Sequence, residues 1–317
     1  MAQYLWVITD GKAGDEYPCI AVAQALGIPF EIRRVNPRSI FAWAMPHGPI
    51  DPKDKPTAAT SPIKPPYPDI AIASGRRSIA YLRKVKQLSG GKTFTVILKD
   101  PRNGVGAADL IWVCEHDKLR GDNVITTLTS PHRFSQTAQT EARGKPLPEI
   151  VALNKPRLAV LVGGNGRHAN FTDRNISDLM QALKLQGETH SLMITTSRRT
   201  PESLSKQLQC LANSGKHLLW DGTGLNPLLQ YLANADAVIV TTDSSNMVGE
   251  AASTGKPIYG FKPDGGHQKF DYFLNELTKM GVLHPFPGPM NGAPYTPIDA
   301  TPQIVHAIQT AYEQAIA

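Results

Sequence analysis

The stretch 237–261 carries residue types that could bind an anion. It opens with an apolar, mostly β-branched run, Ala237–Thr241, which predicts a buried strand. A small polar turn follows, and helical spacing of apolar residues appears at Met247–Ser253. Backbone N–H groups at the start of a helix attract phosphate. The candidate phosphate contacts are Asp243, Ser244, Ser245 and Asn246.

Glu250 lies further along the same predicted helix, where the apolar spacing gives no reason for a carboxylate. A carboxylate at this depth can accept hydrogen bonds from two hydroxyl groups, such as those of a ribose. The phosphate turn lies upstream at a suitable distance for a nucleotide. We therefore expect Glu250 to bind a ribose, and the alternative is a solvated helix residue.

Three other turns follow predicted strands in this half of the chain, after residues 157–162, 190–195 and 216–220. The first two turns are rich in glycine and arginine, which suits phosphate binding. The alternative for each glycine alone is a simple turn. The candidate phosphate contacts are Gly163, Gly164, Asn165, Arg198 and Arg199. The third turn is expected to flank the base of a nucleotide through Asp221, Gly222 and Asn226.

The first half of the chain predicts six strands that end in polar clusters, at residues 5–8, 30–35, 69–73, 93–98, 110–114 and 124–128. Open α/β sheets bind ligands at the carboxyl ends of their strands. Asp15 is the first candidate for a general base that accepts a proton from a hydroxyl group, with His116 and Asp100 behind it. A positive face for an acceptor is expected from Lys12, Arg76, Arg77 and Arg102. The alternative is that these clusters are structural hydrogen-bond networks.

Residues 37–68 contain nine of the 26 prolines and predict a long irregular loop. Phe41, Trp43 and Met45 are expected to be exposed there beside lysines, where they would contact an acceptor or a membrane surface. The alternative is that this loop only packs on the surface of its domain. After this loop, the best candidate for a linker is Arg143–Pro156, which contains three prolines and a glycine.

Length and composition limit the function classes. The 317 residues suit two domains, and a net charge of +6 suits an acidic ligand or an anionic membrane surface. No motif supports binding to nucleic acid. The three cysteines are isolated and predict buried thiols in a reducing compartment. There is no Asp-x-Asp motif and no histidine pair at metal spacing, so we expect no metal and no cofactor.

The predicted elements form two domains of alternating strands and helices, which is the layout of GT-B glycosyltransferases. We expect an N-terminal Rossmann-like domain at 1–150 and a C-terminal one at 151–300, facing each other across a cleft. A helix at 301–317, with its core at Thr301–Ala315, is expected to return to the N-terminal domain. The chain starts directly with a strand and has no apolar run of about 18 residues, so neither a signal peptide nor a membrane span is predicted.

Eight motifs together resemble those of the mitochondrial-fission ELM1-like family. They are TDGKAGDE (9–16), ASGRRS (73–78), KDPR (99–102), EHDKLRG (115–121), LVGGN (161–165), TTSRRTP (195–201), WDGTGLNP (220–227) and TTDSSNMVGEAASTGKP (241–257). Bacterial members of this family often carry the name "predicted nucleoside-diphosphate-sugar epimerase". The resemblance covers nearly the whole chain and implies a GT-B fold. Plant members resemble adaptors that recruit a dynamin-related GTPase to mitochondria.

A more distant resemblance concerns mechanism. The segment GKAGDEYP (11–18) is similar to the glycine loop of the lipid-linked N-acetylglucosaminyltransferase of peptidoglycan synthesis. In that enzyme the proposed base is a histidine three residues before the proline, and that position holds Asp15 in this chain. A glutamate that binds the ribose in that enzyme corresponds to Glu250.

These patterns predict a metal-independent transferase that moves a sugar from a UDP-linked donor to a hydroxyl acceptor, either lipid-linked or a glycan. Two alternatives stay open: a non-hydrolysing sugar-nucleotide 2-epimerase, and a non-catalytic adaptor with a protein partner. An epimerase of the short-chain-dehydrogenase type is not predicted, because the chain lacks Tyr-x-x-x-Lys and a nicotinamide fingerprint. The expected location is the cytoplasm, with peripheral contact at the inner membrane.

Overall fold

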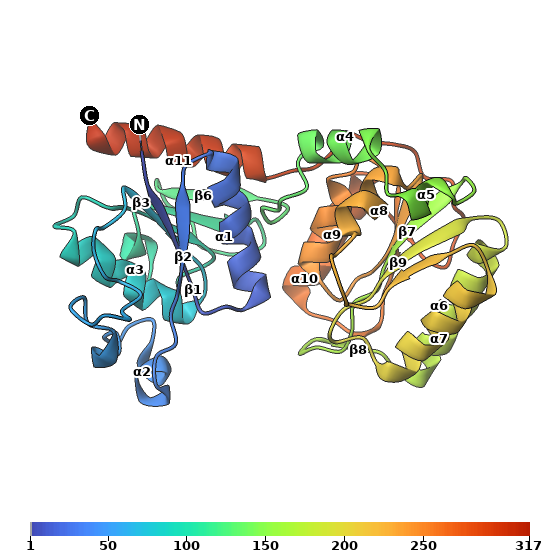
Figure 1. The fold of residues 1–317 in the computed structure, drawn as a ribbon, viewed down its shortest axis with the longest axis horizontal. Helices are drawn as coiled ribbons and strands as arrows, with labels where there is room; N and C mark the ends of the chain where they lie inside the picture. The colour runs from blue at the N-terminus through green and yellow to red at the C-terminus, as the bar shows by residue number, and fades with distance from the viewer. Residues whose placement is uncertain (1) are drawn as a thin grey trace. The chain divides into compact units, whose positions relative to one another are not determined.

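The computed structural model describes residues 2–317, which form two compact units (Figure 1). Unit 1 contains the chain up to Arg133 together with Ala300–Ala317, and unit 2 contains Phe134–Asp299. Each unit has an open sheet of six parallel strands with helices on both faces, which confirms the predicted α/β class. Among residues 2–317 no helix has both the length and the apolar character needed to cross a bilayer.

The sheet of unit 1 has the strand order β2-β1-β3-β4-β5-β6. Its strands are β1 (Leu5–Thr9), β2 (Phe30–Arg34), β3 (Ile70–Ala73), β4 (Phe94–Leu98), β5 (Leu110–Cys114) and β6 (Val124–Thr127). Its helices are α1 (Ala13–Leu26), α2 (Ser39–Ala44), α3 (Arg76–Leu88) and α11 (Thr301–Ile316), with short 3-10 turns at Pro52–Asp54 and Val105–Ala107.

Both faces of the unit 1 sheet are buried, because successive side chains of a strand point to opposite faces. Leu5 and Val7 lie on the face covered by α1 and α11, whereas Trp6 and Ile8 lie on the face covered by α3. On the first of these faces, the ring of Tyr312 on α11 meets Phe94 edge-on at 5.8 Å between centroids. The terminal helix therefore packs within unit 1.

The proline-rich segment is only partly the irregular loop that the sequence predicts. It contains α2, and its residues Met45 and Ile63 are buried in the same core as Trp6. Asp51 is also buried and accepts hydrogen bonds from the backbone and guanidinium of Arg38, which hold the pKa of that carboxyl well below its ordinary value. Buried residues along the segment thus anchor it to the core of unit 1.

The predicted exposure of three side chains in this segment is correct for one of them. Trp43 is 82% exposed, whereas Met45 is only 2% exposed and Phe41 is half-buried beneath the guanidinium of Arg38. Ile40, one turn before Trp43 on α2, is 75% exposed. The exposed apolar residues of α2 are therefore Ile40 and Trp43, since Met45 instead fills the core next to the sheet.

The sheet of unit 2 has the strand order β10-β9-β7-β11-β12-β14. Its strands are β7 (Arg157–Leu161), β9 (Ser191–Thr195), β10 (Leu218–Trp220), β11 (Ala237–Thr241), β12 (Ile258–Phe261) and β14 (Leu283–Pro285), and a small antiparallel ribbon pairs β8 (Ala169–Asn170) with β13 (Asp264–Gly265). Its helices are α4 (Gln136–Gly144), α5 (Pro148–Val151), α6 (Asp173–Gly187), α7 (Glu202–Ser214), α8 (Leu228–Asn234), α9 (Ser245–Ala252) and α10 (Gln268–Lys279).

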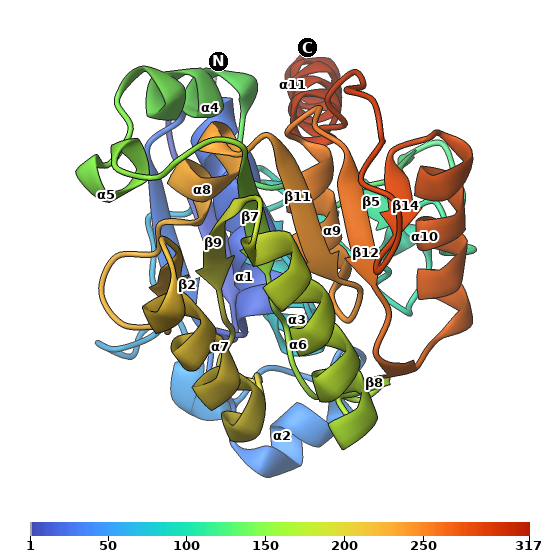
Figure 2. The same cartoon turned by 90° about the vertical axis from the view of Figure 1, so that its right-hand side faces the viewer.

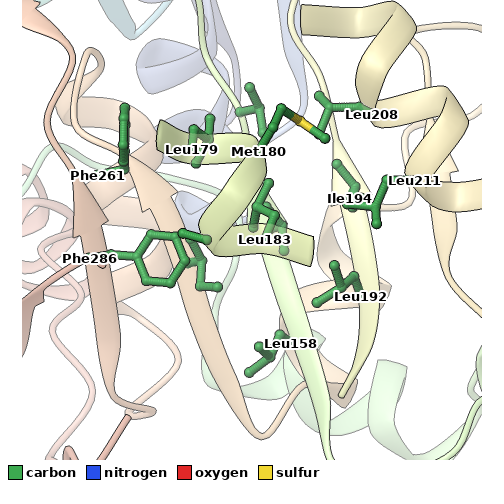
Figure 3. Packing of buried hydrophobic residues seen from close by; sticks show 14 of the residues in the cluster. Leu158, Leu179, Met180, Leu183, Leu192, Ile194, Leu208, Leu211, Phe261 and Phe286 are labelled. Carbon is green, nitrogen blue, oxygen red and sulfur yellow. The ribbon is translucent and has the colours of Figure 1, made fainter. Parts of the chain in front are cut away.

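Helices α6 and α7 lie across one face of this sheet, as Figure 2 shows. Figure 3 shows how Leu179 and Leu183 of α6 and Leu208 of α7 pack onto Leu192 and Ile194 of β9. Helix α9 packs beside β11. This two-sided burial explains why the central strands are continuous apolar runs in the sequence.

The division between the units falls earlier than the expected boundary at 150/151. Helices α4 and α5 belong to unit 2, where α4 packs against α8. The side chain of Gln139 on α4 donates a hydrogen bond of 3.0 Å to the carbonyl of Ser253. Of the prolines that suggested a linker at Arg143–Pro156, Pro148 instead begins helix α5.

Lys256 ties the turn after α9 to the end of α8. Its ammonium donates to the carbonyls of Leu232 at 2.7 Å and Ala233 at 2.8 Å, which belong to the last turn of that helix. Burial, together with the positive charge of Arg143, lowers the pKa of Lys256 from 10.5 to about 8.

This lowered pKa predicts a pH dependence of stability. From about pH 8 to pH 10 the unfolded chain keeps a proton on Lys256 that the folded chain has released, so stability rises with pH. Relative to Lys256→Met, the unfolding free energy of the wild type should rise by at most about 1.4 kcal/mol per pH unit. Urea titrations from pH 7 to pH 10 measure this difference. A difference that stays constant with pH would refute the assignment.

Candidate functional site

The strand order of unit 2 has a topological switch point between β7 and β11. The chain leaves β7 toward β9 and β10 on one side, and the later strands β11, β12 and β14 lie on the other side. Open α/β sheets bind ligands outside the carboxyl ends of the strands at such a point. The segments that meet there are residues 162–166 after β7 and 242–244 after β11.

Asp243 holds these segments together. Its carboxylate is fully buried and accepts hydrogen bonds from Thr241 Oγ1 at 2.7 Å and from the N–H of Gly164 at 3.0 Å. The guanidinium of Arg199, in the turn after β9, donates to the same carboxylate at 3.1 Å. One buried side chain thus connects the carboxyl ends of three adjacent strands.

Glycine is required at both positions after β7, because Asp243 and the backbone of Arg199 lie very close to them. A Cβ atom on Gly163 would lie 2.1 Å from Asp243 Oδ1, and one on Gly164 would lie 2.0 Å from the backbone carbonyl of Arg199. Real Cβ atoms do not approach other heavy atoms so closely. These glycines therefore allow the turns after β7 and β9 to pack against Asp243.

The backbone N–H groups of the glycine-rich turn are already engaged. Gly163 donates to Thr241 Oγ1, Gly164 to Asp243, Asn165 to the carbonyl of Arg199 and Gly166 to the carbonyl of Ala169. Phosphate binding by Gly163, Gly164 and Asn165, as suggested by the sequence, would compete with these bonds. The geometry gives this turn the role of a scaffold.

The backbone N–H groups at the start of α9 differ in their hydrogen bonding from those of the glycine-rich turn. The helix begins at Ser245, two residues before the predicted start, and Ser244 is its N-cap, with Oγ accepting from the N–H of Met247 at 3.5 Å. Among residues 2–317, no acceptor is found for the backbone N–H groups of Ser244, Ser245 and Asn246. These N–H groups are the available donors at the switch point.

Glu250 is half-buried on α9, four residues after Asn246. Residues four apart lie on the same face of a helix, one turn from each other. The available N–H groups thus lie at the N-terminal end of α9, and this carboxylate lies one turn beyond Asn246.

The remaining candidates of unit 2 lie further from the switch point. Arg198 is exposed beside Arg199. Asp221, Gly222 and Asn226 lie in an exposed turn after β10, which is the edge strand. Hydrogen bonds from Thr223 lower the pKa of Asp221, and Asn226 Oδ1 accepts from the N–H of Leu228. In the described part of the chain, no hydrogen bond joins this turn to the segments after β7 and β11.

Unit 1 has its own switch point, between β1 and β3. Asp15 lies in the first turn of α1, which begins at Ala13. Its carboxylate accepts from Lys99 Nζ at 2.9 Å and from Ser74 Oγ at 3.3 Å. Ser74 and Lys99 immediately follow β3 and β4, so Asp15 faces the carboxyl ends of the strands and not the apolar core. Its side chain is 12% exposed.

The expected positive face of unit 1 is only partly neutralised. Lys12 and Arg77 both contact the buried carboxylate of Asp10, at 2.8 and 3.7 Å. Arg76 donates to the carbonyl of Trp43 at 3.5 Å. Arg102 is exposed and adopts a positive φ of 62°, and its N–H donates to Asp100 Oδ1 at 2.8 Å.

Several polar residues around the switch point of unit 1 were not predicted from the sequence. Asp10, Ser74 and Lys99 each follow a strand directly, which is the signal that could have identified them. Glu16 pairs with Arg34 at 2.9 Å on the edge strand, a contact that only the fold brings about. His116, another predicted base, lies half-buried after β5, with Nε2 4.0 Å from Asp117 Oδ2.

Similar sequences identify a family. A model of the family described as "Mitochondrial fission ELM1" matches residues 13–312. The mitochondrial fission protein ELM1 of Arabidopsis thaliana is 28% identical over 248 residues, which cover 70% of this chain and 58% of the plant protein. The uncharacterized protein RP120 of Rickettsia prowazekii is 24% identical over 323 residues, covering 89% of this chain and 90% of that protein. The chain therefore spans little more than half of its plant relative.

Solved structures give the fold. MurG of Acinetobacter baumannii aligns with a TM-score of 0.51 at 14% identity, covering 97% of this chain and 99% of that one. The UDP-GlcNAc 2-epimerase of Methanocaldococcus jannaschii aligns with a TM-score of 0.53 at 10% identity, covering 98% and 92%. At these identities the likeness concerns architecture alone. Together, these similarities show that the chain has the GT-B fold and belongs to the mitochondrial fission ELM1 family.

Proposed function

We propose that unit 2 binds a nucleoside diphosphate, presented as a UDP-linked sugar, at the start of α9. The observation that carries this proposal is the set of available N–H groups at Ser244, Ser245 and Asn246, which lie at the switch point of the sheet. They would hold the diphosphate, aided by the positive end of the helix dipole. Glu250, one turn beyond Asn246 on α9, would accept the ribose hydroxyls.

The charges around the turn are compatible with this assignment. Arg199 contacts the buried Asp243 but keeps 46% of its side chain exposed, and Arg198 beside it is exposed. Guanidinium groups and a helix N-terminus can stabilise the charge of a leaving diphosphate. A divalent cation would not be required for this step.

Proteins of similar fold support the choice of ligand class. A structure of the M. jannaschii UDP-GlcNAc 2-epimerase, with a TM-score of 0.51 and 10% identity, is described as a complex with UDP-GlcNAc and UDP. The MnaA protein of S. aureus, with a TM-score of 0.53 and 12% identity, is described as a co-structure with UDP. We extend this ligand class to unit 2 as part of the proposal.

We further propose that the protein transfers the sugar to a hydroxyl group and that Asp15 accepts the proton of that hydroxyl. Asp15 lies at the switch point of the unit 1 sheet, which is the usual position for a functional side chain in an open sheet. Release of UDP only when an acceptor is present would support transfer. Exchange of the C2 proton of the sugar would support the 2-epimerase instead, and nucleotide binding without either reaction would support an adaptor.

Replacement of Glu250 tests the nucleotide site. Glu250→Ala should weaken UDP binding by about 1–3 kcal/mol, or roughly 5- to 150-fold, because two hydroxyl groups lose a charged acceptor. Isothermal titration calorimetry in the presence of EDTA measures this change and also tests independence from metal. Glu202→Ala is the matched control, since Glu202 is an exposed helical carboxylate on α7 that pairs with Lys206. Equal affinity for the wild type and Glu250→Ala would remove Glu250 from the site.

We also propose that α2 contacts an anionic membrane surface, from which a lipid-linked acceptor would be taken. Ile40 and Trp43 are exposed on this short helix. Nearby, Arg76 and Arg83 donate to backbone carbonyls and not to carboxylates, so these contacts leave their charge uncompensated. Exposed apolar side chains beside cations are typical of peripheral membrane contacts.

Vesicle co-sedimentation tests this contact. The double variant Ile40→Ser, Trp43→Ser should bind vesicles that contain phosphatidylglycerol at least about tenfold less than the wild type, because two apolar anchors are lost. Leu225→Ser is the control, since Leu225 is 97% exposed in unit 2. Equal binding of the double variant and the wild type would exclude α2 as the contact.

A further inference from the structure

We propose that Cys114, His116 and Asp117 form a binding site for a transition-metal dication of the zinc type at the carboxyl end of β5. The thiol sulfur, a ring nitrogen and a carboxylate oxygen of these residues all lie within 4.8 Å of one another. The three residues are partly buried, and the side chains of His116 and Asp117 are 18% and 13% exposed. The proposal does not depend on the nucleotide site in unit 2.

The backbone around these three residues is fixed from several sides. Cys114 is the last residue of β5 and pairs with Thr127 of β6. The N–H of Glu115 donates to the carbonyl of Thr127 at 3.1 Å, and the N–H of Asp117 closes a turn on the carbonyl of Cys114 at 2.9 Å. A sheet end and a hydrogen-bonded turn thus fix the backbone from which the three side chains extend.

Arg120 reinforces the same turn from outside. Its guanidinium donates to the carbonyls of Glu115 at 2.8 Å and Leu119 at 2.7 Å, and also to the carbonyl of Asp117. Preorganised ligands lose little conformational entropy when an ion binds. The backbone that carries the ligand set is therefore fixed before the metal arrives.

The distances suit a tetrahedral ion after small side-chain rotations. Zinc binds thiolate sulfur at about 2.3 Å and imidazole nitrogen or carboxylate oxygen at about 2.0–2.2 Å, which puts tetrahedral ligands about 3.3–3.6 Å apart. His116 Nε2 and Asp117 Oδ2 are now 4.0 Å apart, so they would approach by less than about 1 Å. Three protein ligands would leave one position for water.

The donor types select the class of ion. A thiolate and an imidazole favour zinc and neighbouring transition metals, whereas magnesium and calcium prefer oxygen ligands. None of the common zinc spacings is present, because the three ligands lie within four consecutive residues, and this explains why the sequence did not predict a metal. A metal on His116 would also occupy that side chain, which leaves Asp15 as the candidate base.

Cobalt(II) is a suitable spectroscopic probe because a cobalt ion bound by a thiolate has a charge-transfer band in the near ultraviolet. The full chain is first freed of metal with a chelator and then titrated with CoCl₂ and, separately, with ZnCl₂ in a calorimeter. We expect one ion per chain, the thiolate band, and a rise in the melting temperature with added zinc, because an ion that binds only the folded state stabilises it.

Variants assign the ligands. Cys114→Ser should abolish the thiolate band and weaken zinc binding by at least about 100-fold, since loss of an outer-shell partner alone costs 10- to 100-fold. His116→Asn and Asp117→Asn should weaken zinc binding in the same direction. Cys210→Ser is the matched control, because Cys210 is a free and exposed cysteine on α7.

Two results would overturn the proposal. One is a wild-type cobalt complex without the thiolate band. This measurement uses no variant, so misfolding of a variant cannot affect it. The other is zinc binding that Cys114→Ser leaves unchanged while circular dichroism shows a folded chain, which would indicate surface histidines as the ligands. Loss of UDP binding in Glu250→Ala would bear on the nucleotide site alone.

Discussion

Replacing Asp15 by asparagine is expected to cut sugar-transfer turnover by about 10²- to 10⁴-fold while leaving the affinity for the UDP-sugar nearly unchanged. Asparagine keeps the size of the side chain and an oxygen that can accept from Ser74 and Lys99. It cannot accept the proton of an acceptor hydroxyl. The effect should therefore appear in turnover and not in donor binding.

Glu16→Gln is the matched control for Asp15→Asn. Glu16 is the next residue in the first turn of α1, is also buried, and pairs with Arg34. Its replacement should leave turnover close to the wild-type rate. Steady-state kinetics of UDP release, with the acceptor varied, would measure both variants. A wild-type rate for Asp15→Asn would refute the assignment of the base and would favour the adaptor alternative.

Gly164→Ala is expected to destabilise unit 2 by at least about 3 kcal/mol, at the upper end of the range for overpacked sites. The added methyl carbon would lie 2.0 Å from the backbone carbonyl of Arg199, and a backbone group cannot rotate away as a side chain can. Relief of the clash would separate the turns after β7 and β9. The hydrogen bonds from Asn165 to the carbonyl of Arg199 and from Arg199 to Asp243 would then be lost.

Gly144→Ala provides the control in the same unit. Gly144 is the last residue of α4, and no heavy atom lies within 4 Å of the position of an added Cβ. Its effect on stability should stay within about 0.5 kcal/mol of zero. Urea unfolding of both variants, followed by circular dichroism, gives the comparison. Similar stabilities for the two variants would show that the close packing around Gly164 is not as tight as the geometry indicates.

The buried strands were predictable from the sequence. β5 and β11 have the predicted bounds, because strands buried on both faces are continuous apolar runs between polar turns. Helix starts were less predictable, since α9 begins at Ser245, two residues before the predicted start. The edge strand β14 was missed because Pro285 argues against a strand, although an edge position tolerates proline.

The candidate sites were predictable in position but not in hydrogen bonding. The sequence indicated polar groups at the carboxyl ends of strands, and both switch points carry them. It could not show that Asp243 and Arg199 occupy the N–H and carbonyl groups of the glycine-rich turn, because these contacts join residues far apart in the chain. The pairing of Arg77 with Asp10 was hidden for the same reason.

A crystal structure of the protein with UDP would show directly whether unit 2 binds a nucleoside diphosphate at the start of α9. We expect diphosphate oxygens within hydrogen-bond distance of the N–H groups of Ser244, Ser245 and Asn246, and the ribose hydroxyls on Glu250. UDP bound elsewhere, or crystals soaked in millimolar UDP that show none at α9, would contradict it.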